Sequence, residues 1–385
     1  MATEAYESTP TEDAVREALA TVNDPEIHRP ITDLGMVKSI DIQPDGAVDV
    51  GVYLTVAGCP LRETITSNVT EAVQGVAGVT RVSVELDVMS DEQRRELASS
   101  LRGGQAEREV PFAQPNSLTR VYCVASGKGG VGKSSVTVNL AASMAADGLK
   151  VGVVDADIYG HSVPRMLGAD GRPTQVEDMI MPPQANGVKV ISIGMFTPGN
   201  APVVWRGPML HRALQQFLAD VYWGDLDVLL LDLPPGTGDI AISVAQLIPN
   251  AEILVVTTPQ QAAAEVAERA GSIAVQTHQK ITGVIENMSG MPCPHCDEMI
   301  DVFGTGGGKQ VAEGLTKTTG AEVPVLGGIP IDVRLREGGD EGKPLVLTEP
   351  DSPAGSAIRG IADKLVKQQR GLQGMSLGLT PSNKF

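Results

Sequence analysis

Two hydrophobic patterns divide the chain. Between residues 119 and about 370, short and nearly continuous apolar runs alternate with longer segments of helical period. The runs are RVYCVAS, KVGVVDAD, VKVISIG, VLLLDLP, EILVVTTP, ITGVIENM and VPVLGGIP. Continuous apolar strands are typically buried on both faces, as in a parallel sheet covered by helices. The pattern predicts a doubly wound, mostly parallel α/β domain over residues 119–370.

Residues 1–88 follow a different pattern, which predicts a small α+β domain. TEDAVREALATV has helical period, and the strand-like VKSIDIQ and GAVDVGVYLTV meet across the turn Pro44-Asp45-Gly46. Such a turn between alternating strands indicates a hairpin. A helix is expected after Cys59-Pro60, and VTRVSVELDV alternates as a strand with one buried face.

The segment between these domains, residues 89–118, is predicted to be a linker. It opens with the charged, helix-prone DEQRRELASSLR and continues with the Gly-, Gln- and Pro-rich GGQAEREVPFAQPNS. This composition favours a flexible or partly helical connection. Residues 371–385, GLQGMSLGLTPSNKF, are expected to form a flexible tail.

Composition narrows the function classes. The formal net charge of −17 over 385 residues disfavours general binding to nucleic acid, because most of the surface repels phosphate. No signal peptide is visible at the amino terminus, and no apolar run approaches the ~20 residues that span a bilayer. Four cysteines in a chain of this length argue against a disulfide framework and for metal or redox chemistry. We therefore expect a cytoplasmic protein with neither a membrane nor a nucleic-acid partner.

The strongest motif fits G-x-x-x-x-G-K-[ST] and follows a predicted buried strand. The nucleotide-binding residues that it predicts are Gly127, Lys128, Gly129, Gly130, Val131, Gly132, Lys133, Ser134 and Ser135. Its glycines let backbone N–H groups surround phosphates at a helix N-terminus. Lys133 would reach the β- and γ-phosphates, and the Ser134 hydroxyl would bind Mg²⁺. The motif predicts a nucleoside triphosphate as the ligand, and ATP is the nucleotide that the resemblance described below implies.

Carboxylates follow two of the predicted strands. VVDAD supplies Asp155 and Asp157, and VLLLDLPPG supplies Asp232. A carboxylate at the end of an apolar strand can face bound phosphates and hold Mg²⁺ directly or through water. Capping of the strand end is the alternative interpretation of each position.

The second lysine of the loop, Lys128, resembles the signature of the deviant Walker A group of dimeric ATPases, which includes nitrogenase iron protein, the Min and Par ATPases and the Mrp/ApbC proteins. The resemblance implies a homodimer in which Lys128 reaches the partner's nucleotide. It also implies that Asp157 orients the attacking water, that Asp232 is the Walker B residue and that Asp155 supports the metal. Asn287 matches the position at which this group contacts adenine, and a turn asparagine is the alternative interpretation. The catalytic set that the resemblance implies is Lys128, Lys133, Asp157 and Asp232.

A separate candidate site is the C-x-x-C pair of Cys293 and Cys296, with His295 interpreted as a bystander. Zinc sites and [4Fe–4S] sites both usually take four protein ligands, so one pair is incomplete. Cys59 could add a ligand, whereas Cys123 lies within a predicted strand and is expected in the core. A two-fold symmetric dimer would instead bring two pairs together.

The stretches SGKGGVGKSS, DADIYGHSVPRMLG, WRGPM, LDLPPGTGD and ENMSGMPCPHC resemble the Mrp/ApbC branch of iron–sulfur carrier ATPases across residues 119–370. The resemblance implies a P-loop NTPase fold and a cluster, [4Fe–4S] by expectation, bridged between subunits by Cys293 and Cys296. It also implies slow ATP hydrolysis coupled to cluster transfer, and donor and recipient apoproteins as partners. DPEI, DLGMV and LTVAGCPL resemble the SufT/PaaD-like domain, in which Cys59 is a candidate reactive thiol or buried apolar residue.

Two alternatives stay open at this point. One is a Min/Par-like switch ATPase without a cluster, although the last helical stretch, AIRGIADKLVKQQ, is typical of a packed helix rather than of a basic membrane anchor. The other is a P-loop ATPase whose cysteines hold structural zinc at a dimer interface, since zinc and iron–sulfur clusters share ligands. A dehydrogenase is disfavoured because GKGGVGKS lacks the G-x-G-x-x-G fingerprint.

Overall fold

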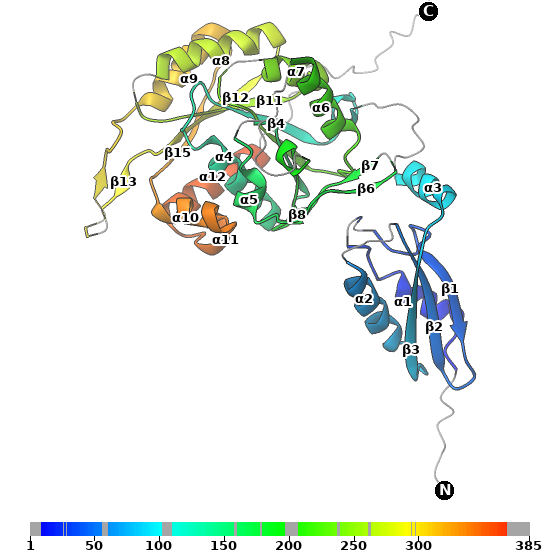
Figure 1. The fold of residues 1–385 in the computed structure, drawn as a ribbon. Helices are drawn as coiled ribbons and strands as arrows, with labels where there is room; N and C mark the ends of the chain where they lie inside the picture. Colours follow the sequence, from blue (N-terminus) through cyan, green and yellow to red (C-terminus); the bar gives the residue numbers. More distant parts are fainter. Residues whose placement is uncertain are drawn as a thin grey trace, which may run out of the picture. The chain divides into compact units, whose positions relative to one another are not determined.

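The computed structural model divides the chain into two compact units (Figure 1). Unit 1 comprises Met1–Arg108, Pro173–Pro182 and Asp220–Tyr222, and unit 2 comprises the remaining segments Glu109–Arg172, Pro183–Ala219 and Trp223–Phe385. The structure describes residues 9–25, 27, 29–55, 61–101, 110–157, 160–177, 179–196, 207–236, 239–260, 263–293, 295–296 and 298–367. Cys59, Pro294, residues 102–109 of the predicted linker and the predicted tail 371–385 lie outside these described residues.

Unit 1 is built on a three-stranded sheet in the order β1-β2-β3, as the alternating pattern predicts. Strands β1 and β2 pair in antiparallel fashion, and β2 and β3 pair in parallel. Its elements along the chain are α1 (Glu12–Leu19), β1 (Val37–Ile42), β2 (Ala47–Leu54), α2 (Arg62–Gln74), β3 (Arg81–Val88) and α3 (Asp91–Leu101). Ile65, Val69 and Val73 recur every fourth residue of α2 and are buried, so one stripe of this helix enters the core.

Helix α3 and a distant hairpin also belong to unit 1. The hairpin consists of β6 (Thr174–Val176) and β7 (Met179–Met181), which pair in antiparallel fashion. Leu97 of α3 shares a buried apolar cluster with residues of this hairpin, including Val176 and Met179. Arg94 of α3 also lies 3.2 Å from Glu177 in a half-buried ion pair. The segment predicted as a linker thus contains a helix that packs within unit 1.

Unit 2 is built on an eight-stranded sheet in the order β15-β12-β11-β4-β10-β5-β9-β8. All neighbouring strands are parallel except the short edge strand β8, which pairs with β9 in antiparallel fashion. The strands are β4 (Arg120–Ala125), β5 (Val151–Asp155), β8 (Gln184–Ala185), β9 (Val188–Ser192), β10 (Val228–Asp232), β11 (Glu252–Thr257), β12 (Ile281–Asn287) and β15 (Val325–Ile329). Each predicted apolar run forms one of these strands, so the doubly wound α/β class is confirmed.

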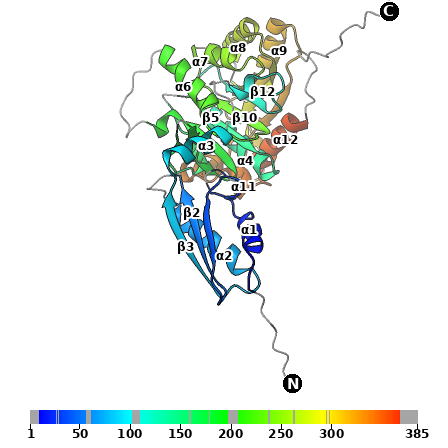
Figure 2. The ribbon, with the colours of Figure 1, turned by 90° about the vertical axis from the view of Figure 1, so that its right-hand side faces the viewer.

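Helices cover both faces of this sheet (Figures 1 and 2). Helices α6 to α9 lie on one face, and α4, α5 and α10 to α12 lie on the other. The helices are α4 (Lys133–Ala146), α5 (Val163–Leu167), α6 (Gly207–Ala219), α7 (Asp239–Leu247), α8 (Ala263–Thr277), α9 (Gly307–Thr319), α10 (Val333–Glu341), α11 (Leu345–Thr348) and α12 (Pro353–Lys367), with 3₁₀ turns at Pro111–Ala113 and Ile193–Met195. Within the described ranges, no helix has the length and apolar character to span a bilayer.

The last helix, α12, packs into the core of unit 2. Ile358, Ile361 and Leu365 are fully or almost fully buried. The prediction of a packed terminal helix is therefore confirmed. A surface-bound amphipathic helix would leave that apolar stripe uncovered by protein.

A small hairpin leaves the sheet after β12. It consists of β13 (Met291–Pro292) and β14 (Met299–Ile300), paired in antiparallel fashion, and it projects from the body of unit 2 (Figure 1). The chain returns from it to α9 and then to the edge strand β15. The cysteine pair is thus displayed on a protrusion rather than in the core.

Candidate functional site

The nucleotide motif lies between the central strand β4 and helix α4. Gly130 and Gly132 have φ angles of 78°, in the left-handed region that glycine tolerates without a steric cost. Gly132 is the N-cap of α4, so the loop delivers the following backbone N–H groups to the helix N-terminus. Gly236 N–H, from the loop after β10, donates to the Ser126 carbonyl at 2.8 Å and ties that loop to the motif.

The Lys133 side chain is buried against Asp232 at the end of β10. Its Nζ lies 2.8 Å from Asp232 Oδ2, with only 6% of the lysine side chain exposed. Ser134 Oγ donates to the same oxygen at 2.5 Å, and Thr137 Oγ1 lies 2.8 Å from Asp232 Oδ1. One carboxylate therefore joins the lysine and the hydroxyl of the motif to the neighbouring strand.

Asp155 lies at the end of β5, in register with Asp232 on β10. Burial and the nearby Asp232 carboxylate raise the pKa of Asp155 to about 7. Ser192 Oγ donates to Asp155 Oδ2 at 3.1 Å, and the Asp157 N–H donates to Oδ1 at 3.2 Å. Both hydrogen bonds stabilise the ionised Asp155 carboxylate and so lower its pKa, but the effect of burial is larger and the pKa stays raised.

These groups fit magnesium. The ion takes oxygen ligands and usually keeps several waters. The Ser134 hydroxyl and the carboxylates of Asp155 and Asp232 form a donor set of this kind at the carboxyl edge of the sheet. Asp157 lies two residues beyond Asp155 and accepts from the Gly160 N–H at 3.2 Å.

Lys128 and Asn287, two further residues predicted for the nucleotide site, make hydrogen bonds whose partners could not be predicted from the sequence. Lys128 Nζ donates to Gln260 Oε1 at 2.6 Å in the loop after β11. Asn287 is 3% exposed, and its Nδ2 donates to the Val131 carbonyl of the motif at 2.8 Å. Asn287 therefore contacts the phosphate-binding loop directly within the chain.

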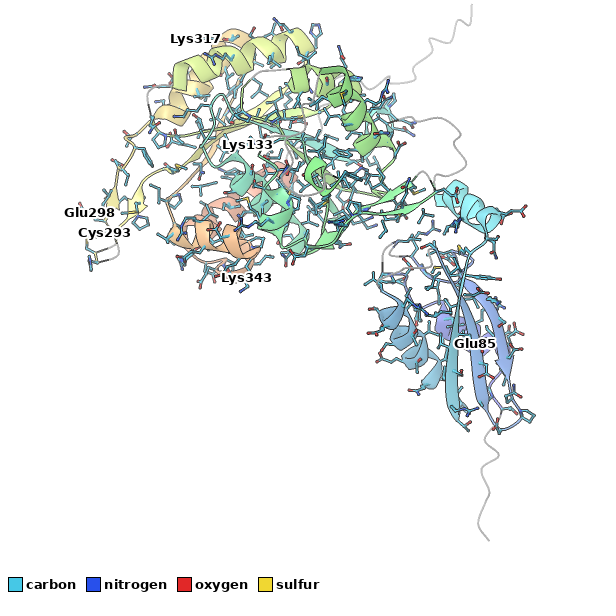
Figure 3. All side chains as sticks on the ribbon, viewed as in Figure 1. Glu85, Lys133, Cys293, Glu298, Lys317 and Lys343 are labelled. Carbon is cyan, nitrogen blue, oxygen red and sulfur yellow. The ribbon has the colours of Figure 1, made fainter. Side chains whose placement is uncertain are left out.

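The cysteine pair is separate from the nucleotide site within one chain. Figure 3 shows Cys293 and Glu298 on the projecting hairpin, well away from Lys133. Cys293 is half-buried and Cys296 is exposed, whereas Cys123 is buried in β4 as predicted. Burial raises the pKa of Cys123 to about 12, which makes it a poor metal ligand. Among the described residues, no three His, Cys, Asp or Glu side chains form a group that could hold a metal ion.

Four contact residues were missed at the sequence level: Thr137, Ser192, Gln260 and Glu286. Thr137 had a usable signal, because it follows Lys133 by one helical turn and must share its face of α4. Ser192 and Gln260 had none, since only the strand order brings them to Asp155 and Lys128. Glu286 accepts a hydrogen bond from the Gly308 N–H at 2.6 Å, across a separation of 22 residues.

Comparison with protein families gives two matches. The family described as NUBPL iron-transfer P-loop NTPase matches residues 117–366, and the family described as iron-sulfur cluster assembly protein matches residues 12–85. The first match covers most of the α/β unit, including both candidate sites. The second covers most of the small α+β domain.

Individual proteins agree with these matches. An iron-sulfur cluster carrier protein of Mycobacterium bovis is 68% identical over 371 residues, which is 96% of this chain and 97% of the relative. A protein of the same name from Deinococcus radiodurans is 43% identical, over 92% of this chain and 95% of its own. A nucleotide-binding protein of Archaeoglobus fulgidus, solved with ADP, is 35% identical with a TM-score of 0.50, over 60% of this chain and 92% of its own.

Proposed function

The chain belongs to the family of NUBPL iron-transfer P-loop NTPases, and we propose that it hydrolyses ATP to load or release an iron–sulfur cluster held between two subunits. The observation that carries this proposal is the C-x-x-C pair of half-buried Cys293 and exposed Cys296 on a projecting hairpin of a P-loop NTPase. Two thiolates supply half of the four ligands that a [4Fe–4S] cluster takes. A second copy of the hairpin supplies the other half.

The surface beside the cysteines supports pairing with a second copy. Four apolar residues lie three to seven positions after Cys296 and are between 37% and 52% exposed: Met299, Ile300, Val302 and Phe303. Apolar side chains gathered in this way typically mark an interaction surface. A two-fold axis near the hairpin would bury them while bringing four thiolates together.

At the nucleotide site, the backbone N–H groups of the loop bind the phosphates of ATP, and Lys133 moves from Asp232 to the transferred phosphate. Magnesium, when bound to Ser134 and Asp232, would neutralise developing charge on the phosphates. Asp157 orients the attacking water, and Lys128 exchanges Gln260 for the nucleotide of the partner subunit. Asn287, which lies against the loop, contacts the adenine.

We further propose that residues 1–88 form a docking domain for cluster donors and recipient apoproteins, with Cys59 as a transient ligand, and that residues 89–118 connect this domain to the ATPase domain 119–370. The match of residues 12–85 to an iron–sulfur assembly family supports this role. Thiolate ligands must stay reduced, which suits the cytoplasm.

Subunit mixing tests the bridging arrangement. Two differently tagged chains, wild type and the Cys293→Ala/Cys296→Ala double variant, are co-expressed and the mixed dimer is isolated. After reconstitution with iron and sulfide under anaerobic conditions, a bridged cluster should be absent from the mixed dimer, because only two ligands remain. A mixed dimer with half of the wild-type iron would show that each subunit holds its own metal, and bridging would be wrong.

A further inference from the structure

Strand β12 ends between the two candidate sites. Its last residues are Glu286 and Asn287, and Cys293 follows Asn287 by only six positions. Successive side chains of a strand point to opposite faces. Glu286 and Asn287 therefore project in opposite directions from one short stretch of backbone.

Asn287 joins this stretch to the phosphate-binding loop. Its Nδ2 donates to the Val131 carbonyl at 2.8 Å in a buried setting. The approach is so close that a Cβ on Gly132 would lie 2.3 Å from the same nitrogen. Because Asn287 is buried and hydrogen-bonded to this loop, a shift of the loop at Val131 or Gly132 acts directly on the Asn287 side chain at the end of β12.

Glu286 joins the same stretch to both ends of the segment between β12 and α9, residues 288–306, which carries the cysteines and is called the excursion below. Ser289 Oγ, at the start of the excursion, donates to Glu286 Oε1 at 2.7 Å. The Gly308 N–H, in the first turn of α9 where the excursion ends, donates to Oε2 at 2.6 Å. A carboxylate that accepts at a helix N-terminus makes a strong, charge-assisted contact. One side chain thus closes the base of the segment that carries Cys293 and Cys296.

The backbone after β12 is also held in an unusual conformation. Met288 has a φ of 60° and Gly290 a φ of 76°. The left-handed region is uncommon for methionine, so its neighbours must hold it there. The Ser289 N–H donates to the Ile329 carbonyl and the Ile331 N–H to the Gly290 carbonyl, each at 2.8 Å. These two hydrogen bonds therefore fix the backbone that follows β12 to the end of the neighbouring strand β15 and the residues just after it.

We propose that Glu286 and Asn287 are positioning residues that couple the nucleotide state of the P-loop to the accessibility of Cys293 and Cys296. This inference rests on the proposed function, to which it adds the route of regulation. Phosphate binding shifts the loop, Asn287 carries the shift to the end of β12, and Glu286 passes it to the base of the hairpin. Coupling between two sites commonly changes affinity or exposure by about 5- to 150-fold.

Thiol alkylation in the cluster-free protein measures this coupling. Rates at Cys293 and Cys296 are followed by peptide mass spectrometry, with and without a non-hydrolysable ATP analogue and magnesium. In the wild type we expect the analogue to change the rates by about fivefold or more. Glu286→Ala removes both contacts at the base, and should reduce that ratio to below about twofold while nucleotide affinity stays within about twofold of the wild type.

Glu252→Ala is the matched control. Glu252 is also a strand glutamate with two contacts, from Thr282 Oγ1 and from Lys280 Nζ at 3.2 Å. It is the first residue of β11, so it lies at the amino-terminal end of the parallel strands, opposite the end at which Glu286 lies. This variant should keep the wild-type ratio. Ser289→Ala removes a single contact and provides a second test if Glu286→Ala folds poorly, with an intermediate ratio expected.

Two outcomes would overturn the inference: a wild-type ratio near one, or a ratio in Glu286→Ala and Ser289→Ala equal to that of the wild type. Neither outcome depends on the cluster, because the assay uses apoprotein. A preserved nucleotide effect in a chain that binds no iron would instead refute the proposed function and leave the coupling intact.

Discussion

Replacing Gly132 with alanine tests the close contact between the phosphate-binding loop and β12. The added Cβ would lie 2.3 Å from Asn287 Nδ2, and the residue would have to keep a φ of 78°. A left-handed conformation costs a residue with a Cβ about 1–2 kcal/mol. Overpacking of a buried contact adds about 1–3 kcal/mol. We therefore expect Gly132→Ala to lower the free energy of unfolding of the ATPase unit by about 2–5 kcal/mol.

The overlap can be separated from the backbone strain by a double-mutant cycle with Asn287→Ala. That variant removes the atom that the new Cβ would meet, although it leaves the Val131 carbonyl without its donor. In this background Gly132→Ala should cost only the strain of about 1–2 kcal/mol. The predicted interaction energy is therefore about 1–3 kcal/mol.

Urea denaturation followed by tryptophan fluorescence provides these energies. Both tryptophans fall in the sequence range 119–370 of the ATPase domain, and Trp223 is buried there, so the signal reports this domain. The m-value checks that the variants unfold from the same compact state. Additivity of the two substitutions within about 0.5 kcal/mol would refute the contact between Gly132 and Asn287.

Three further predictions address the two sites. Folded Asp155 has a pKa of about 7, whereas an unfolded aspartate loses its proton near pH 4, so the folded state binds the extra proton between these two pH values. The Tm of the nucleotide-free, magnesium-free wild type should therefore fall between about pH 4 and pH 7 relative to that of Asp155→Asn, and parallel pH profiles would contradict this. Cys123, with its pKa raised to about 12, should resist iodoacetamide at pH 7.5, whereas the more accessible Cys293 and Cys296 react; peptide mapping that finds Cys123 labelled first would contradict its burial. Lys128→Ala should lower ATP turnover by about tenfold or more with little change in nucleotide affinity, because the lysine acts across the dimer; unchanged turnover would exclude that role.

The sequence predicts the fold well because its strands are buried on both faces. Runs such as VLLLDLP and EILVVTTP leave no polar face, so the parallel sheet and its helical layers follow from the pattern. The hairpin at Gly46 is equally local, since its φ of 80° requires glycine. The packing of α3 with the β6–β7 hairpin was not predictable, because it joins segments about 80 residues apart.

The site was predictable where chemistry and local sequence coincide. The loop glycines, Lys133 and Ser134 form one contiguous motif, and Asp232 ends an obvious strand. The contacts of Asn287 and Glu286 were not predictable, because they depend on which strand lies beside β4 and on where α9 begins. A glutamate before an asparagine at a strand end does not by itself predict a contact. Only the folded backbone shows that the Glu286 carboxylate binds Ser289 and Gly308 at the two ends of the excursion.

The central claim is that paired C-x-x-C hairpins hold an iron–sulfur cluster between two subunits. Anaerobic analysis of iron, acid-labile sulfide and zinc in the purified dimer, with Cys293→Ala/Cys296→Ala beside the wild type, tests it most directly. We predict about four irons and four sulfides per wild-type dimer, as one bridging [4Fe–4S] cluster contains, and neither in the variant. Stoichiometric zinc, or no metal after reconstitution with iron and sulfide, would contradict the claim and leave an ATPase whose cysteines are structural.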